Sequence, residues 1–381
     1  MIERKAAVKK VHQSLAENPV TAILGPRQCG KTTLARQVIG RGEGVFFDME
    51  NPTHLSRLAS PLLALQNQTK VVVIDEIQRM PKLFEVLRVL VDDSSFKGKF
   101  LVLGSAAPSL VKGISESLAG RVGFVDLSGI SLQETKTEDF VPLWVRGGFP
   151  RSYLSKSNAA AYRWRENFIR TFLERDIPQL GISIPATTLR RFWTMIAHYH
   201  GQVLNTAELA RSLGAAEGTA RRYLDILSGA YMVRQLQPYF VNLKKRQVKS
   251  PKIYVRDSGI LHALLALESA EHIYSHPKLG ASFEGFAVEE ICSLSGSRDV
   301  YFWATHGGAE LDVLLFKKGK AIGFEIKYTD SPRITKSMRV ALEDLNLHHL
   351  YVVYPGDETF PLSESITAIS VTNLSSAAQP D

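Results

Sequence analysis

The sequence predicts an α/β protein that is divided into more than one domain. Three observations support this fold class. The chain has 381 residues, more than a single hydrophobic core usually accommodates. Short apolar runs alternate with amphipathic helical segments up to about residue 130, and a second set of strands follows a helical middle region. The domains expected from these changes of pattern are 1–130, 131–186, 187–245, 246–375 and a disordered tail at 376–381.

The first region is expected to form a parallel β-sheet. Its β-rich runs are short and nearly continuous in apolar residues, and they lie at 21–25, 44–49, 70–76, 99–105 and 122–128. The segment 80–93 has apolar residues at helical spacing, for example Leu83, Leu87 and Leu90. Continuous apolar strands that alternate with amphipathic helices are typical of a parallel sheet with helices on both faces.

A phosphate-binding loop is predicted between the first strand and the helix that follows it. Residues 25–32 read GPRQCGKT and match G-x-x-x-x-G-K-[ST]. Glycines let backbone N–H groups turn toward a phosphate, and the positive end of the next helix attracts the anion. Lys31 is expected to reach the β- and γ-phosphate oxygens of ATP, and the Thr32 hydroxyl to ligate Mg²⁺. The residues expected to contact the nucleotide are Gly25, Pro26, Arg27, Gln28, Cys29, Gly30, Lys31, Thr32 and Thr33.

Two acidic residues at the end of a buried strand complete the predicted nucleotide site. The run VVVID ends in Asp75, and Glu76 follows it. Ligands of open α/β sheets bind at the carboxyl ends of the strands. Asp75 is suited to hold Mg²⁺ through water, and Glu76 to orient or deprotonate an attacking water. The adjacent pair favours ATP hydrolysis over passive nucleotide storage.

Two further residues near this site have open interpretations. Ser105 ends the next strand, where its hydroxyl either contacts the γ-phosphate or attacking water, or only belongs to a strand-to-loop turn. Arg121 lies just before the last strand of the region. An arginine supplied across a subunit interface can act catalytically by stabilising the transferring phosphoryl group, and the alternative is an ordinary surface residue.

These motifs resemble the AAA superfamily of P-loop ATPases. The resemblance is strongest to the bacterial and archaeal AAA-family ATPases whose C-terminal half was long labelled a domain of unknown function. It rests on GPRQCGKTTLARQ, VVVIDEIQRMP, LVLGSA, LAGRV and GGFPRSYL, and it continues in RRYLDIL and KSPKIYVRDSGIL, so it covers nearly the whole chain. Family members often have serine where this chain has Ala106. The resemblance implies Mg²⁺-dependent ATP hydrolysis and a homo-oligomeric ring, commonly a hexamer.

The middle of the chain is expected to begin with helices and to continue as a winged helix. Residues 131–186 read as a helical lid or connector. Within 187–245, TAELARSLG predicts a helix with Thr206 as its N-cap and Gly214 as its stop. A second helix follows after a short turn, and a strand pair comes next. This helix-turn-helix pattern is typical of DNA-binding modules.

Basic residues in and after this module are candidate nucleic-acid contacts. Clustered Lys and Arg side chains provide salt-dependent, sequence-independent affinity for phosphates. The alternative is that the module is a structural lid whose basic run is a solvated loop. The candidates lie at the start of the second helix and in NLKKRQVKSPK, which also contains Lys252; they are Arg221, Arg222, Lys244, Lys245, Arg246 and Lys249.

The last region contains a predicted hairpin that collects charged residues. With a turn at 318–319, antiparallel pairing places Asp312 opposite Glu325 and Glu310 opposite Lys327. Residues two apart in a strand share a face, so these four side chains project to one side. Carboxylates that lie directly opposite each other destabilise a sheet, and they suit a divalent cation better. The other side is expected to carry Leu311, Val313, Phe324, Ile326 and Tyr328.

This hairpin and a preceding acidic helix resemble the restriction-endonuclease-like, PD-(D/E)xK, nucleases. The resemblance rests on Glu284 in the helix, Asp312, and the tripeptide that runs from Glu325 to Lys327. It implies an α/β fold of that type over 246–375 and catalytic roles for these four charged residues. Asp312 and Glu325 would be ligands of a second Mg²⁺ or of Mn²⁺. Two functions stay open, a metal-dependent nuclease and a domain that binds nucleic acid or protein without cutting.

Composition limits the cellular compartments and the kinds of partner that are expected for the protein. The only cysteines are Cys29 and Cys292, which argues for a reducing compartment and against a disulfide framework. We expect a cytoplasmic protein without a membrane partner, because no secretory signal is evident and no apolar stretch reaches the roughly 18 residues of a bilayer span. The net charge of +8 is compatible with DNA as a partner.

The whole sequence therefore predicts a protein that binds ATP and ADP and hydrolyses ATP. Its nucleotide cycle is expected to drive or gate a DNA-engaging winged helix and a nuclease-like domain. The alternative is a nucleotide-switched regulatory or binding protein whose nuclease-fold domain does not cleave.

Overall fold

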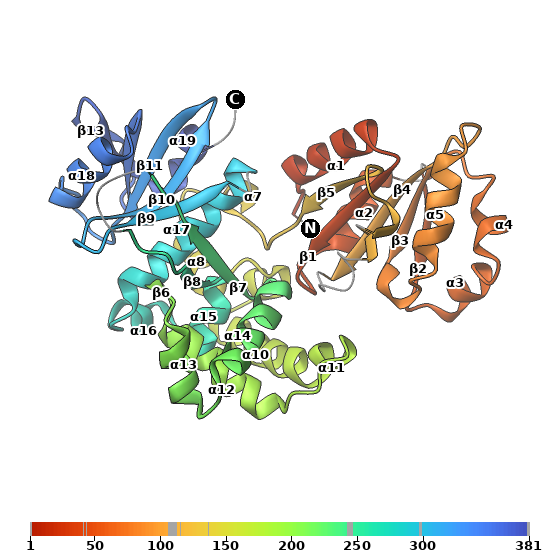
Figure 1. Ribbon diagram of the computed structural model, residues 1–381, viewed down its shortest axis with the longest axis horizontal. Helices are drawn as coiled ribbons and strands as arrows, with labels where there is room; N and C mark the ends of the chain where they lie inside the picture. The colour runs from red at the N-terminus through yellow and green to blue at the C-terminus, as the bar shows by residue number, and fades with distance from the viewer. Residues whose placement is uncertain are drawn as a thin grey trace. The chain divides into compact units, whose positions relative to one another are not determined.

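The chain divides into two compact units (Figure 1). Unit 1 comprises Met1–Gly129 and Gly229–Tyr231, and unit 2 comprises Ile130–Ser228 and Met232–Asp381. The computed structural model describes the chain with short gaps, at residues 2–40, 42, 44–105, 113–114, 116–135, 137–241, 247–296 and 299–378.

Unit 1 contains a five-stranded sheet in which all neighbouring strands are parallel. Each strand expected from the sequence is present, so the predicted parallel sheet is confirmed. The strand that precedes the phosphate loop, β1, lies between β4 and β5. In sheet order the strands are β2 (Gly44–Asp48), β3 (Val71–Asp75), β4 (Lys99–Ser105), β1 (Val20–Gly25) and β5 (Val122–Asp126).

Two helices pack together on the sheet of unit 1. Apolar side chains of α1 and α2, such as Leu15 and Leu34, form one buried cluster with strand residues such as Ile23 and Val73. The helix expected at 80–93 is also present, with its apolar side chains buried. The helices are α1 (Lys5–Glu17), α2 (Lys31–Ile39), α3 (Pro52–Arg57), α4 (Pro61–Leu65), a 3₁₀ turn (Ile77–Arg79) and α5 (Leu83–Asp92).

Unit 2 begins with helices, as the sequence predicts for residues 131–200. One turn at Phe172–Asp176 is a π-helix. The first helices are α7 (Leu132–Thr135), α8 (Val141–Arg146), α9 (Pro150–Tyr153), α10 (Asn158–Thr171), α11 (Ile177–Gln179) and α12 (Ala186–His198). The later ones are α13 (Thr206–Leu213), α14 (Glu217–Gly229), α15 (Ser258–Leu264), α16 (Ala270–Tyr274), α17 (Leu279–Ser295), α18 (Lys336–Asp344) and α19 (Ser375–Ala378).

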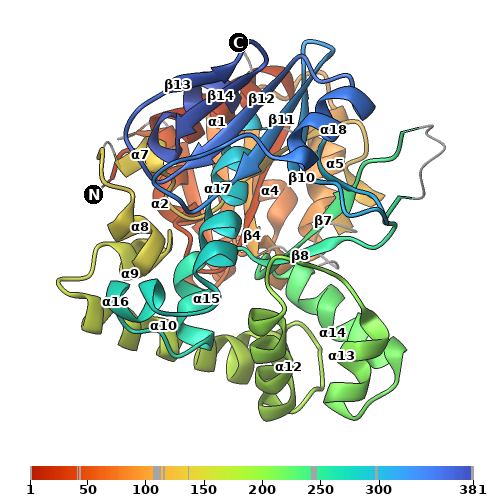
Figure 2. The same cartoon turned by 90° about the vertical axis from the view of Figure 1, so that its left-hand side faces the viewer.

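A nine-stranded mixed sheet runs through unit 2 (Figure 2). Strand β7 pairs with β8 in antiparallel and with β9 in parallel orientation. The expected boundary between 245 and 246 therefore falls between two paired strands of one sheet. In sheet order the strands are β13 (Phe360–Ser363), β14 (Ile366–Ser370), β12 (His349–Tyr354), β11 (Lys320–Ile326), β10 (Glu310–Lys317), β9 (Val300–Ala304), β7 (Val233–Pro238), β8 (Lys252–Val255) and β6 (Gln202–Val203).

The predicted helix pair corresponds to α13 and α14. Gly214 adopts a left-handed conformation with φ 73° and ends α13, as expected. The N-cap prediction is wrong by one residue, because the Asn205 side chain accepts the hydrogen bond from the backbone N–H of Glu208. Thr206 is instead the first residue of the helix. Asparagine is as good an N-cap as threonine or better, so residue type alone does not decide between the two neighbours.

The predicted hairpin is formed by β10 and β11. Lys317 pairs with Lys320, and the turn residues Lys318 and Gly319 both have positive φ, at 49° and 76°. The pairing continues in register to Val313 and Phe324, which confirms the predicted turn and register over these residues. The predicted pair of Asp312 and Glu325 lies one step beyond these paired residues, where the Asp312 side chain accepts a hydrogen bond from the N–H of Ile326.

The strand face predicted for Leu311 is wrong. The pairing of β10 with β9 shifts register between Leu311 and Leu314. Strict alternation would place these two leucines on opposite faces, yet both belong to one buried cluster with Met338 of α18 and Leu350 of β12. A bulge of this kind interrupts the period of two, and the sequence pattern does not reveal it.

The expected disordered tail at 376–381 is wrong for its first three residues. Residues 376–378 belong to α19, where Ala377 and Ala378 are buried. Residues 379–381 lie outside the described part of the chain. Among the described helices, none is long and apolar enough to cross a bilayer.

Candidate functional site

The phosphate loop connects the carboxyl end of β1 to the first turn of α2. Gln28 and Gly30 have positive φ values of 64° and 101°, which turn the backbone into the helix. Gly30 is the N-cap of α2. Because a glycine has no side chain to accept hydrogen bonds from the first turn, the N–H groups at this helix start stay available to an anion.

The backbone carbonyl of Leu127 lies close to the loop and limits which side chains fit at two of its positions. A Cβ atom on Gly25 would lie 2.1 Å from the Leu127 carbonyl oxygen, so this position requires glycine. Cys29 is fully buried, and its Sγ lies 3.6 Å from the same oxygen. The thiol points into the core of unit 1, so Cys29 offers only its backbone to a nucleotide.

The ammonium group of Lys31 lies within the loop. Its side chain is buried, and Nζ donates to the carbonyl oxygens of Gly25 at 3.0 Å and Pro26 at 2.9 Å. Backbone carbonyls of the loop therefore accept the hydrogen bonds that the sequence motif predicts for phosphate oxygens.

A hydrogen bond joins the two halves of the predicted nucleotide site. Thr32 Oγ1, in the first turn of α2, donates to Asp75 Oδ2 at 2.6 Å. Asp75 ends β3, which is separated from β1 by β4, and parallel strands bring both groups to the same edge of the sheet. Burial raises the pKa of Asp75, against the effect of the Thr32 hydrogen bond. The hydroxyl and the carboxylate are adjacent hard oxygen donors, which fits Mg²⁺.

Glu76 follows Asp75 in a left-handed backbone conformation with φ 53°. This conformation is uncommon for residues with a side chain and is often found at functional sites. The Glu76 backbone N–H donates to Asp75 Oδ1 at 3.0 Å, and the Glu76 carboxylate accepts a hydrogen bond from Gln78. Gln78 thus positions Glu76, a role that was not expected from the sequence.

The other predicted nucleotide contacts lie around the same loop. Pro26 is buried, Arg27 is half-buried, and Thr33 is exposed in the first turn of α2. Ser105 of β4 pairs with Gly25 of β1, which places its backbone beside the loop. The side chain of Ser105 lies outside the described residues.

Arg121 lies at the opposite end of the strands, where β1 and β5 begin. Its carbonyl oxygen accepts a hydrogen bond from the N–H of Val20, the first residue of β1, whereas the phosphate loop leaves the last residue of that strand. Its guanidinium forms an exposed ion pair with Asp92, with Nε 2.6 Å from Oδ1. Arg121 is therefore remote from the phosphate loop of its own subunit, and the role across a subunit interface stays a prediction.

Arg4 contacts the phosphate loop and was not among the residues predicted from the sequence. Its Nη1 donates to the carbonyl oxygens of Cys29 and Ser128, both at 3.2 Å, and Nη2 donates to that of Gly129 at 2.8 Å. It joins the loop to the last residues of the first segment of unit 1. No motif marks such a residue, because its partners are backbone carbonyls that are distant in sequence.

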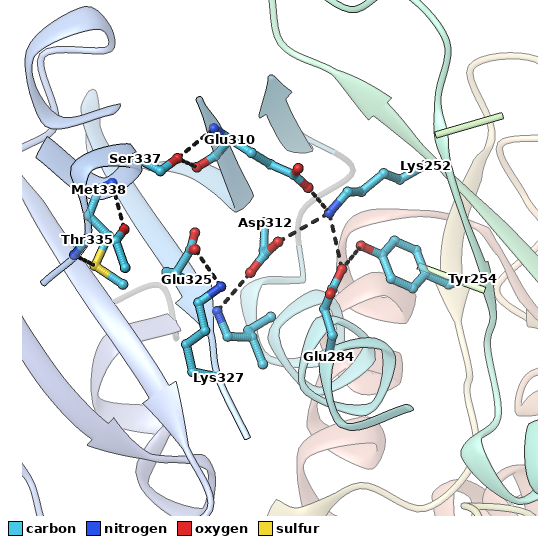
Figure 3. A network of polar contacts seen from close by, with 11 residues as sticks. Lys252, Tyr254, Glu284, Glu310, Asp312, Glu325, Lys327, Thr335, Ser337 and Met338 are labelled. Carbon is cyan, nitrogen blue, oxygen red and sulfur yellow. Dashed lines mark hydrogen bonds and ion pairs between the residues drawn. The ribbon is translucent and has the colours of Figure 1, made fainter. Parts of the chain in front are cut away.

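Unit 2 gathers charged side chains where α17, β8, β10 and β11 meet (Figure 3). Asp312 and Glu325 are buried, and Glu284 of α17 is 18% exposed. Asp312 Oδ2 accepts a hydrogen bond at 2.9 Å from the backbone N–H of Ile326, across the hairpin. Lys327 Nζ lies 2.8 Å from Glu325 Oε1. The four residues predicted for the nuclease-like site are thus part of one polar network.

Lys252, the first residue of β8, lies within this network. Its Nζ is 3.2 Å from Glu284 Oε1 and 3.2 Å from Asp312 Oδ1, and it also contacts the Glu310 carboxylate. Burial opposes its charge, but Tyr254 and the acidic neighbours raise the pKa of Lys252 well above its usual value. The expectation that Lys252 belongs to an exposed basic run is therefore wrong.

Two acidic side chains of the network, Glu284 and Glu325, hold their protons more tightly than usual. Burial, with the charge of Asp312, raises the pKa of Glu284 to about 7 and that of Glu325 to about 8. Lys252 and Lys327 only partly offset these effects. Glu325 Oε2 is buried and has no hydrogen-bond partner among the described residues.

The fit of this network to a metal ion is incomplete. Asp312 and Glu325 provide the oxygen ligands that a divalent cation prefers. However, within the described ranges no group of three or more His, Cys, Asp and Glu side chains is placed to hold a metal. Lys252 lies between Glu284 and Asp312 instead. The arrangement seen here suits an ammonium group better than a metal.

The predicted nucleic-acid contacts are described in part. Arg221 and Arg222 are exposed on α14, and Leu224 of the same helix is buried. Lys249, which belongs to the basic run, is exposed. The remaining candidates, Lys244, Lys245 and Arg246, lie outside the described residues.

Three family models match consecutive parts of the chain. An AAA domain matches residues 17–136, which include both halves of the nucleotide site. A domain of unknown function (DUF8612) matches residues 137–271, and another (DUF4143) matches residues 279–374. Lys252 falls in the second match, and its partners Glu284 and Asp312 fall in the third.

Relatives and solved structures complete the comparison. Two uncharacterized proteins, from Mycobacterium bovis and Mycobacterium tuberculosis, are each 49% identical over 381 residues, covering 100% of this chain and 86% of the relative. A solved Walker-type ATPase of Pyrococcus abyssi is 15% identical with a TM-score of 0.49, covering 70% of this chain and 96% of that chain.

Proposed function

The chain belongs to the family of these two mycobacterial proteins and carries an AAA domain, and on that premise we propose that it binds and hydrolyses ATP in unit 1. The observation that carries the proposal is the hydrogen bond from Thr32 to Asp75. It joins the end of the phosphate loop to the end of β3, with Glu76 next in the chain.

Each of these residues of unit 1 has a separate role in ATP hydrolysis. The N–H groups at the start of α2 bind phosphate oxygens, and Lys31 neutralises charge on the β- and γ-phosphates. Thr32 and Asp75 would hold Mg²⁺, which neutralises phosphate charge when bound. Glu76, held by Gln78, orients the attacking water and accepts its proton. Arg121 acts only if the protein assembles so that this arginine reaches a neighbouring subunit.

We expect Lys31→Ala to lower the Mg²⁺-dependent ATPase rate of the full-length protein to about 1% or less, because the phosphates lose their main cationic partner. Glu76→Gln is expected to keep ATP binding and to lose hydrolysis by about 100-fold or more. The exposed Lys9→Ala is the matched control and should hydrolyse ATP at the wild-type rate. Wild-type turnover by Lys31→Ala would disprove the assignment of this site.

For unit 2 we propose a nucleic-acid-directed role that the nucleotide cycle of unit 1 drives or gates. Two features support it. Arg221 and Arg222 are exposed on the second of two helices joined by a short turn, and Asp312, Glu325 and Lys327 lie together on a hairpin. In this proposal α13, α14, β7 and β8 bind DNA as a winged helix, and the hairpin belongs to a restriction-endonuclease-like domain.

Cleavage is tested on linear, nicked and single-stranded DNA with Mg²⁺ or Mn²⁺, with and without ATP. We expect Glu325→Ala and Lys327→Ala to abolish metal-dependent cleavage while ATP hydrolysis continues, because both side chains belong to unit 2. If the wild-type protein cuts none of these substrates, the non-cleaving alternative holds. That alternative is favoured by one observation, the ammonium group of Lys252 among the carboxylates.

A further inference from the structure

Lys252 is surrounded by carboxylates on several sides (Figure 3). Its side chain is only 4% exposed, and its Nζ contacts Glu284 of α17 together with Glu310 and Asp312 of β10. An ammonium group has three N–H donors, and here three carboxylates are within reach of them. The lysine thus offsets the negative charge of three carboxylates at once.

The carboxylates of this network outnumber its ammonium groups. Counted as ionised, four carboxylates (Glu284, Glu310, Asp312, Glu325) and two ammonium groups (Lys252, Lys327) carry a formal charge of −2, and the raised pKa values of Glu284 and Glu325 mean that protons offset part of it. Buried charge without a partner is costly. Glu325 Oε2 is buried and has no partner among the residues described. Positive charge beyond that of the two lysines, as a proton or as a cation, would therefore stabilise these carboxylates.

We propose that Lys252 is an internal counter-ion that occupies the place of a divalent cation between Glu284 and Asp312. A cation binds there only when the ammonium group of Lys252 withdraws, because two positive charges a few ångströms apart repel each other in a buried site. In the arrangement described here the site is closed. This inference rests on the proposed metal-dependent role of unit 2.

The origin of Lys252 in the chain makes such a withdrawal possible. The lysine comes from β8, whereas its acidic partners come from α17 and β10. Strand β8 pairs with β6 and β7, the strands next to α13 and α14, and the carbonyl oxygen of Pro251 accepts a hydrogen bond from the N–H of Leu204. Withdrawal of the ammonium group would therefore require the Lys252 side chain or this hydrogen-bonded segment to move relative to α17 and β10.

The test measures Mn²⁺ binding to the nucleotide-free full-length protein, by electron paramagnetic resonance of free Mn²⁺. Lys252→Met keeps an apolar stem of similar length and removes the charge. We expect it to bind Mn²⁺ about tenfold more tightly or better than wild type, because the competing charge is gone. The exposed Lys156→Met is the matched control and should bind as wild type does. The Glu325→Gln change is made in the wild-type protein and in each variant. The binding that it removes is the part that belongs to this site.

The outcomes separate this inference from the proposed function. Glu325-dependent binding in wild type that Lys252→Met leaves unchanged or weakens overturns the inference alone. Glu325-dependent binding that appears only in Lys252→Met supports it. If neither protein shows Glu325-dependent binding, both the inference and the metal-dependent role are wrong.

A second measurement covers the case in which Lys252→Met does not fold. The reactivity of single lysines of the wild-type protein toward acetylation is followed by mass spectrometry with and without Mn²⁺. We expect Mn²⁺ to increase acetylation of Lys252 and not of the exposed Lys156, and Glu325→Gln to abolish the increase. Unchanged or reduced acetylation of Lys252 at saturating Mn²⁺ contradicts the displacement.

Discussion

Neighbouring residues of α17 show how strongly surroundings change the chemistry of one residue type. Burial alone would raise the pKa of Glu289, but Arg234 and Arg256 contact its carboxylate and lower the pKa to about 2. Glu290 is also buried, but among the described residues no arginine contacts its carboxylate. Burial raises the pKa of Glu290 to about 8. Its Oε2 accepts a hydrogen bond from the N–H of Leu132 at 3.0 Å.

The raised pKa of Glu290 predicts how stability depends on pH. The folded protein keeps this proton up to about pH 8, whereas the unfolded chain releases it near 4.5, the ordinary pKa of a glutamate. Stabilisation by this group is therefore complete below pH 4.5 and is lost as the pH rises toward 8, by at most about 1.4 kcal/mol per pH unit. Glu290→Gln, which cannot ionise, should flatten the fall of the melting temperature between about pH 5 and pH 8.

The matched control is Glu174→Gln, a change at an exposed glutamate of unit 2. It should leave the pH dependence of the melting temperature as in wild type. An equally steep fall in Glu290→Gln would show that another group causes the dependence.

Elements of unit 2 explain two of the sequence segments that carry the family resemblance. In GGFPRSYL, the N–H of Gly148 donates to Asp257 Oδ2 at 2.7 Å, and Asp257 belongs to KSPKIYVRDSGIL. An added Cβ on Gly259 of the second segment would lie 2.8 Å from the backbone nitrogen of Gly147, the first residue of GGFPRSYL, and 2.2 Å from the carbonyl oxygen of Arg146, which precedes it. The two segments are thus in direct contact inside unit 2, and their residues have a packing role.

Helix α14 carries the prediction for nucleic-acid binding. If Arg221 and Arg222 contact phosphates, Arg221→Ala and Arg222→Ala should each weaken DNA binding similarly for all sequences. Each change should also reduce the slope of log K against log salt by about 0.9, which is the expected value for one phosphate contact in a duplex. The measurement is fluorescence anisotropy with labelled duplex DNA over a range of salt concentrations.

The exposed Arg163→Ala, on α10, is the matched control and should keep both the affinity and the slope. Wild-type slopes in both α14 variants would favour the structural interpretation of this helix pair. No binding of the wild-type protein to DNA at low salt would indicate a protein partner.

The elements themselves were predictable to different degrees. The five strands of unit 1 follow the sequence closely, because continuous apolar runs bounded by helices have few alternative folds. The hairpin turn at Lys318 and Gly319 was also predictable from pairing and turn residues. The bulge near Leu311 was not, since it depends on how β9 pairs with β10.

At the scale of the whole molecule, the chain places the residues proposed for ATP hydrolysis in unit 1 and a carboxylate–lysine network in unit 2. Arg4 contacts both the phosphate loop and Gly129, the residue after which the chain enters unit 2. If a nucleotide changes the conformation of the loop, the contact between Arg4 and the carbonyl oxygen of Cys29 should change as well. This contact is within unit 1 and depends on no arrangement of the two units.

The sequence by itself determined which residues form the proposed nucleotide site, because the residues of a phosphate loop must be consecutive and an acidic pair must end a buried strand. Spacing along the chain records such local requirements. Only the tertiary structure decided the surroundings of Lys252, whose partners Glu284 and Asp312 are 32 and 60 residues away. A lysine in a basic run looks solvated in sequence. Its burial among acids depends on which strand lies beside which helix, and no local pattern contains that information.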